Sequence, residues 1–212
     1  LGQNIKALEV NGTFDDCQRL VKSTFLKREM AEDLNLTSAN SINISRLVPQ
    51  SFYYFEAARK LPHGVKPTFV IPSGNFGNLT AGLLAEKLGL EVERFVAATN
   101  RNDVIPAYLQ EGEYRPRPSV ATISNAMDVG APSNIERLIY LARDDRSLLA
   151  DLTSEAVEDE TIRSRIRTFH EEFGEIICPH TATLPVPRAI ASAGTSNRSA
   201  IASTSRRENG SG

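Results

Sequence analysis

Residues 68–89 read TFVIPSGNFGNLTAGLLAEKLG and contain a complete strand, loop and helix. The continuously apolar run at 68–71 is typical of a strand that is buried on both faces. A glycine-containing loop follows, and residues 78–88 have the composition of a helix, which Gly89 is well suited to end. A second expected strand at 93–98 completes a β-α-β unit, for which we expect parallel strands and a right-handed crossover.

The sequence on both sides of this unit alternates between strand-like and helix-like patterns. Strands are expected at 5–10 and 175–178, and the acidic run at 155–160 is expected to be the exposed start of a helix. Helices are expected at 14–33, at 44–55 with a kink or a new turn at Pro49, and at 103–109, 134–142 and 161–173. This alternation predicts an α/β fold: an open, mostly parallel twisted sheet with helices on both faces, here incomplete.

The composition excludes several classes of protein. The chain has 212 residues, with 24 Lys and Arg against 26 Asp and Glu, and this near-neutral balance favours neither nucleic acid nor an anionic membrane as a partner. No stretch approaches the roughly 20 apolar residues of a membrane span. Only two cysteines are present, Cys17 and Cys178, which suits a reducing, cytoplasmic compartment.

The two ends of the chain differ from its middle. The chain starts at Leu1 rather than at Met, so we expect it to be part of something larger. Residues 184–212 contain six Ser, five Ala, four Arg and no aromatic residue. We expect this segment to be a disordered tail, and native, vector-derived and frame-shifted origins are all open. The predicted domain boundaries are therefore 1–183 and 184–212.

The loop after the first buried strand is the strongest candidate site. Loops at the carboxyl ends of parallel strands bind ligands, and a helix N-terminus offers unpaired N–H groups to an anion. Gly74 and Gly77 lack the Cβ atoms that would keep a phosphate away, and Asn78 is placed as an N-cap or an anion donor. The loop has neither the Walker motif nor the three-glycine dinucleotide fingerprint. The alternative is a tight turn whose glycines serve packing only.

Three further stretches are weaker candidates. Asn40 and Ser41 open an expected helix, and Arg46 beyond them suits a second phosphate or a carboxylate. The alternative is an N-cap with a surface arginine. The polar stretch at 122–130 is either a substrate loop or a plain connection. At 178–180, one Cys and one His are too few for zinc, and the rigid spacing across the intervening proline makes a nucleophilic Cys-His pair awkward.

Together these motifs resemble the threonine synthase family, pyridoxal-phosphate enzymes of the tryptophan-synthase-β-like fold. The resemblance covers residues 1–183 and follows the bacterial and fungal branch of the family. The segments that carry it, in the order of the family, are GTFDDC at 12–17, LTSANSINISRL at 36–47, VIPSGNFGNLTAGL at 70–83, AATNRND at 97–103 and SNAMDV at 124–129.

The resemblance implies a reaction and two groups of binding residues. Threonine synthase is a carbon-oxygen lyase that converts O-phospho-L-homoserine and water to L-threonine and phosphate, with pyridoxal 5'-phosphate as the electron sink. The residues that correspond to the family's cofactor-phosphate loop are Gly74, Asn75, Phe76, Gly77 and Asn78. The residues that correspond to its substrate-phosphate segment are Asn40, Ser41 and Arg46.

The chain also departs from the family. The Schiff-base lysine of the family lies in a Phe-Lys-Asp motif, which does not occur here, so no catalytic residue is assigned. We expect an inactive part of the enzyme, whose partners are the small-molecule substrate and the missing N-terminal half. The alternative is a non-catalytic binding or interaction protein built on the same fragment. The missing third glycine argues against a dinucleotide enzyme.

Overall fold

The computed structural model describes residues 2–143 and 147–184, which fall into two compact units divided between Thr37 and Ser38. The first unit contains α1 (Phe14–Leu26) and α2 (Arg28–Asp33). Thr13 and Asp16 form a reciprocal capping box at the start of α1. The single helix expected at 14–33 is interrupted at Lys27, which leaves the helical conformation with a ψ of 86°.

The strand expected at 5–10 is wrong, because these residues are irregular in the structure. All six are exposed to solvent, so the apolar residues of their alternating pattern are not buried against another element. An isolated strand without a partner is not stable in water.

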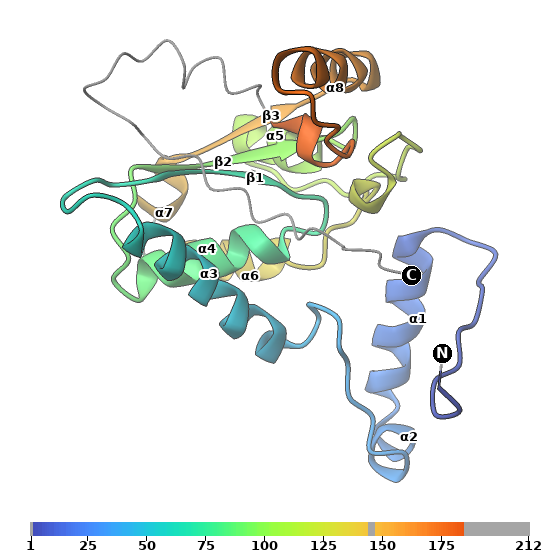
Figure 1. The fold of residues 1–212 in the computed structure, drawn as a ribbon. Helices are drawn as coiled ribbons and strands as arrows, with labels where there is room; N and C mark the ends of the chain where they lie inside the picture. The colour runs from blue at the N-terminus through green and yellow to red at the C-terminus, as the bar shows by residue number, and fades with distance from the viewer. Residues whose placement is uncertain (1, 144–146, 185–212) are drawn as a thin grey trace. The chain divides into compact units, whose positions relative to one another are not determined.

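The second unit is built on a three-stranded parallel sheet in the order β1-β2-β3 (Figure 1). Its strands are β1 (Thr68–Pro72), β2 (Arg94–Thr99) and β3 (Leu152–Ala156). In register, Phe69 lies beside Phe95, and Phe95 lies beside Leu152. The expected β-α-β unit and the parallel sheet are confirmed.

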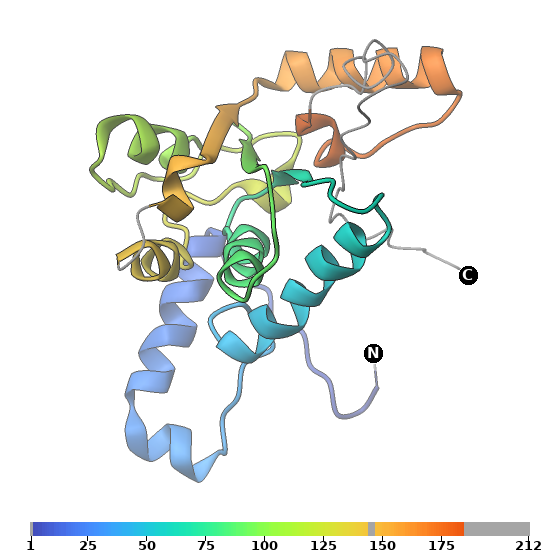
Figure 2. The ribbon, with the colours of Figure 1, turned by 90° about the vertical axis from the view of Figure 1, so that its left-hand side faces the viewer.

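Nine helical segments accompany the sheet among the residues described from Ser38 onward. They are η1 (Ile44–Arg46), α3 (Leu47–Arg59), α4 (Gly77–Lys87), α5 (Val104–Glu111), η2 (Asn125–Met127), α6 (Ile135–Arg143), α7 (Ser147–Ala150), α8 (Asp159–Phe173) and η3 (Thr181–Thr183). Helices α3, α4 and α6 lie on one side of the sheet and α8 on the other, as Figure 2 also shows after rotation. Pro49 lies in the first turn of α3, where its missing N–H removes no helical hydrogen bond.

Two sequence predictions near the end of the chain need correction. Strand β3 was missed because its sequence, LTSEA, is polar and mostly exposed, and its Glu155 is therefore not part of the helix start expected at 155–160. The strand expected at 175–178 is wrong, because these residues are irregular. Ile177 packs instead with Val157, Ile162 and Ala182 in a local cluster beside α8.

The main core lies between the sheet and helices α3, α4 and α6. Tyr54 packs edge-on against Phe69, with ring centroids 4.9 Å apart, and Phe69 stacks on Phe95. A Cβ on Gly82 of α4 would lie 2.7 Å from the Phe95 ring, so only glycine lets α4 approach the sheet this closely. On the opposite face, Leu184 packs against the core strands.

The predicted tail falls outside the described residues from 185 to 212, so its disorder and the boundary at 184 stay predictions. Across the part of the chain that the structure describes, no helix is long and apolar enough to cross a membrane.

Candidate phosphate-binding site

The loop from Ser73 to Asn78 joins β1 to α4 and is closed by its own side chains. Phe76 adopts the left-handed conformation, with φ 58°, and is the N-cap residue of α4. Asn78 Oδ1 accepts hydrogen bonds from Ser73 Oγ (2.5 Å) and from the Leu79 N–H (3.0 Å), while its Nδ2 donates to the Pro72 carbonyl (2.8 Å). Asn78 is therefore not the N-cap, and its side chain holds the loop on the end of β1.

This arrangement leaves a row of backbone donors unpaired. Among the described residues, no acceptor bonds the N–H groups of Gly74, Asn75, Phe76, Gly77 and Asn78. The flanking donors are paired, since the Ser73 N–H reaches the Ala98 carbonyl at 3.0 Å. Unpaired N–H groups at a helix N-terminus attract an anion through their dipoles and the helix macrodipole.

The two glycines of the loop make room for other segments of the chain. A Cβ on Gly74 would lie 2.6 Å from the Met127 Cα, and a Cβ on Gly77 would lie 3.2 Å from the Ser41 Cβ. Both glycines therefore allow other segments of the chain to pack on the loop. This packing role supports the alternative given for the glycines, and their part in an anion site stays a prediction that the free N–H groups of the loop support.

The second segment singled out in the sequence meets this loop at Ser41. Asn75 Nδ2 donates to Ser41 Oγ at 3.2 Å, although 34 residues separate the two. Asn134 Nδ2 donates to the same Ser41 Oγ at 2.9 Å and to the Asn75 carbonyl at 2.9 Å. Ser133 completes the junction, because its N–H and its Oγ both donate to Asn75 Oδ1. The structure thus brings the two predicted phosphate segments together.

Arg137 of α6 holds the second segment in place and was missed by the sequence analysis. Its Nη1 donates to the Ser41 carbonyl at 2.7 Å and to Asn134 Oδ1 at 2.6 Å, and its Nη2 donates to the Ile42 carbonyl. The sequence marks the start of this helix only by a Ser-Asn cap signal. Nothing local indicates that Asn134 is fully buried or that Arg137 turns toward a segment 95 residues away.

The other two predicted residues of the second segment, Asn40 and Arg46, differ in their side-chain contacts. Asn40 does not open a helix: its Oδ1 accepts from the Ile42 N–H at 3.2 Å, and Asn43 caps η1 by accepting from the Ser45 N–H. Arg46 ends η1 and is exposed. Its guanidinium has neither a hydrogen bond nor an ion pair to any other described residue, so its charge is available to a ligand.

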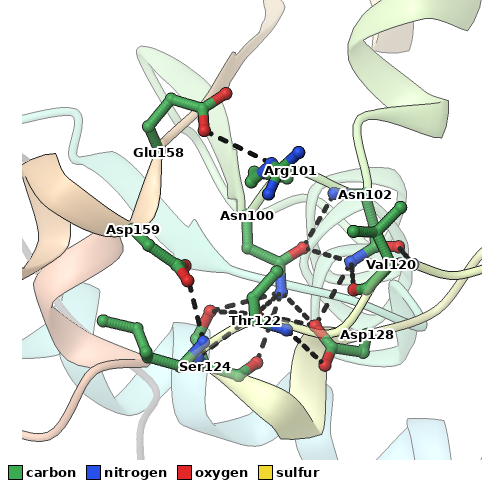
Figure 3. Close-up of polar contacts among 10 residues, drawn as sticks. Asn100, Arg101, Asn102, Val120, Thr122, Ser124, Asp128, Glu158 and Asp159 are labelled. Atoms are coloured by element: carbon green, nitrogen blue, oxygen red, sulfur yellow. Dashed lines mark hydrogen bonds and ion pairs between the residues drawn. The ribbon is translucent and has the colours of Figure 1, made fainter.

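The Cys-His candidate forms no nucleophilic pair in the described residues. Cys178 Sγ lies 3.3 Å from Thr181 Oγ1, and His180 Nε2 accepts a hydrogen bond from the Ala126 N–H at 3.1 Å. His180 therefore fastens the 122–130 stretch to the end of the described chain. That stretch contains Asp128, whose polar contacts are drawn in Figure 3.

Comparison with known proteins supports both the fold and the motifs. No protein-family model matches the chain. The threonine synthase of Serratia marcescens is 50% identical over 184 residues, which cover 86% of this chain and 43% of the relative. The threonine synthase of Escherichia coli K12 is 49% identical with the same coverage. The chain thus spans less than half the length of these relatives.

Solved structures agree. The crystal structure of threonine synthase from Escherichia coli has a TM-score of 0.84 and 45% identity, covering 96% of this chain and 47% of its own. A pyridoxal-phosphate-bound threonine synthase from Brucella melitensis has a TM-score of 0.77 and 31% identity, covering 94% and 48% respectively. The resemblance found in the sequence is therefore confirmed: over less than half the length of each relative, this chain is homologous to threonine synthases and shares their tryptophan-synthase-β-like fold.

Proposed function

We propose that this chain supplies the phosphate-binding part of a pyridoxal-phosphate-dependent threonine synthase. The whole enzyme would convert O-phospho-L-homoserine and water to L-threonine and phosphate, as a cytoplasmic carbon-oxygen lyase. The observation that carries the proposal is the row of five N–H groups from Gly74 to Asn78, directly beside Ser41, that have no acceptor among the described residues. Cofactor and substrate each carry one phosphate, which matches two adjoining anion-binding segments.

The loop from Gly74 to Asn78 fits the phosphate of the cofactor. A phosphate monoester is a dianion with several acceptor oxygens, and this loop presents successive donors at the positive end of α4. When bound, pyridoxal phosphate supplies an electron sink for negative charge at the carbon atoms of an amino acid substrate. The loop's part in this chemistry is to bind and orient the phosphate.

The segment with Asn40, Ser41 and Arg46 fits the phosphate of the substrate. Ser41 Oγ accepts hydrogen bonds from the side-chain amides of Asn75 and Asn134, so the hydroxyl can act toward a ligand as a donor. The hydroxyl proton now points to Asn40 Oδ1 at 3.3 Å, a long contact that a phosphate oxygen can replace. Arg46 would neutralise charge on the departing phosphate.

The chain's own residues do not complete the reaction. No lysine lies in a Phe-Lys-Asp motif, so no group is assigned to hold the cofactor covalently or to move the Cα proton. We therefore expect no turnover of phosphohomoserine by the isolated chain. Activity would need the part of a threonine synthase that this chain does not match.

The test compares pyridoxal phosphate with pyridoxal, which lacks the phosphate. Exposed lysines react with the aldehyde of either compound, so pyridoxal measures that background. We expect pyridoxal phosphate to bind at least about tenfold more tightly, a difference of about 1.4 kcal/mol. The bound phosphate should also shift the backbone amide resonances of Gly74 to Asn78 in a ¹⁵N-labelled chain. Equal affinities with unshifted loop amides would refute the proposal.

A further inference from the structure

A network of polar side chains lies where β2 ends, next to the Gly74–Asn78 loop. Asn100, Asn102, Thr122, Ser124 and Asp128 are joined by hydrogen bonds (Figure 3). Asn100 and Ser124 are fully buried, and Asn102 is 7% exposed. Buried polar groups of this kind are stable only when they are paired, so the network fixes the positions of its members.

The carboxylate of Asp128 is the common acceptor of this network. Its Oδ1 accepts from Thr122 Oγ1 (2.7 Å), Asn100 Nδ2 (2.8 Å) and Asn102 Nδ2 (3.2 Å), and its Oδ2 accepts from the Thr122 N–H (3.0 Å). Both oxygens therefore face donors only. In an Asn at position 128, the side-chain NH₂ group would face at least one of these donors in either orientation of the amide, and two donors cannot bond each other. Asn therefore cannot replace Asp here, although it has the same shape.

The backbone next to Asp128 touches the candidate phosphate loop. The space that a Gly74 Cβ would need is filled by the Met127 backbone, whose Cα would lie 2.6 Å away. Met127 ends η2, and the Met127 and Asp128 N–H groups both bond within that turn. A displacement of Asp128 would therefore move the backbone that fixes Gly74.

We propose that Asp128 is a positioning residue for the phosphate loop: by holding 122–128 against the end of β2, it sets the backbone of Met127 and through it the N–H groups of Gly74–Asn78. The inference rests on the proposed function in taking phosphate as the ligand of that loop. Asp128 itself is bonded within the network and has no assigned contact with the ligand.

The experiment compares Asp128→Asn with Asp103→Asn. Asp103 is a matched control because its carboxylate forms only a partly exposed ion pair with Arg117, at 2.6 Å, so the same chemical change there spares the network. In ¹⁵N-labelled chains, Asp128→Asn should shift the amide resonances of Gly74 to Gly77 and weaken binding of inorganic phosphate at least about tenfold. The Asp103 variant should do neither. Shifts confined to 120–128, with the loop amides and the phosphate affinity unchanged, would overturn the proposal.

A second variant covers the case in which Asp128→Asn does not fold. Thr122→Val keeps the side-chain shape and removes the hydroxyl, which donates to Asp128 at 2.7 Å and accepts from the Asn100 side-chain amide and the Ser124 N–H, while the Thr122 N–H and both Asn amides still reach Asp128. It should shift the same loop amides by a smaller amount, and unshifted loop amides would again overturn the proposal. If the unaltered chain does not bind phosphate, the proposed function fails, but the loop amides of both variants still decide whether Asp128 positions the loop.

Discussion

The two segments that we assign to phosphate binding differ in what holds them. The loop from Ser73 to Asn78 is closed by its own residues, through the end of β1 and the side chain of Asn78, and is also held from outside by Ser133 and the Met127 backbone. The segment from Asn40 to Arg46 is fixed from far away, because Asn134 and Arg137 of the α6 region donate to Ser41 and Ile42. A local sequence motif can therefore specify how the first segment closes on itself, whereas the position of the second segment depends on the assembled fold.

The largest effect is expected at Gly74, where the otherwise local loop depends on a distant segment. In Gly74→Ala, the new Cβ would meet the Met127 backbone at 2.6 Å, so either the loop or the segment around Met127 must shift. We expect a loss of about 3 kcal/mol in the free energy of unfolding and loss of phosphate binding. Gly77→Ala is the matched control, because its Cβ would meet side chains rather than backbone, the nearest being Ser41 at 3.2 Å, and should cost less. Urea unfolding measures both, and equal costs would contradict the prediction.

Arg137→Ala tests the distant support of the second segment. It leaves the Ser41 and Ile42 carbonyls without their partner, and water can replace part of the loss because Arg137 is only half-buried. We expect a loss of about 2 kcal/mol in the free energy of unfolding. Amide resonances of 40–46 should shift more than those of 74–78. Larger shifts at 74–78 would show that the two segments are not supported separately. Arg143→Ala, on the same helix, is the control.

Tyr54→Phe tests whether the phosphate loop keeps its phosphate affinity when it loses one hydrogen bond from α3. The Tyr54 hydroxyl donates to the Asn78 carbonyl at 2.6 Å and so joins α3 to the first turn of α4. Removing one such hydrogen bond should lower the free energy of unfolding by about 1 kcal/mol. Because the loop also has its own contacts, phosphate affinity should change little. Thermal unfolding and a phosphate titration measure the two quantities, and a large loss of affinity at unchanged stability would contradict a local origin of the loop.

The smallest effect concerns the loss of folding stability at acidic pH. Glu56 lies on α3, beyond the second segment, and its pKa is lowered from 4.5 to about 2, chiefly by the side-chain hydrogen bonds from Arg59. Because the folded pKa lies below the unfolded one, this contribution is complete above pH 4.5 and is lost as the pH falls toward about 2. In Glu56→Gln, the urea midpoint should fall less over this range than in the unaltered chain. The change should be small, since the pair is exposed.

The elements that the sequence predicted well are those with strong local signals. The apolar runs of β1 and β2 and the helix between them need no distant partner to be recognised. The apolar or alternating runs at 5–10 and 175–178 gave wrong strand predictions because they pair with no strand among the described residues. Polar β3 was missed because it owes its strand conformation to pairing with β2. Pairing is a tertiary property, which short periodic patterns do not encode.

The same division runs through the candidate site. The sequence by itself determined the kind of site: a glycine-containing loop between a buried strand and a helix, an Asn-Ser-Arg segment, and the resemblance that joins them. Only the tertiary structure decided that Ser41 meets Asn75, that Arg137 and Asn134 hold Ser41, and that Gly74 is required by the Met127 backbone. The physical reason is that backbone donors at a helix start follow from local chain geometry, whereas contacts between residues dozens of positions apart follow from how the helices and loops pack.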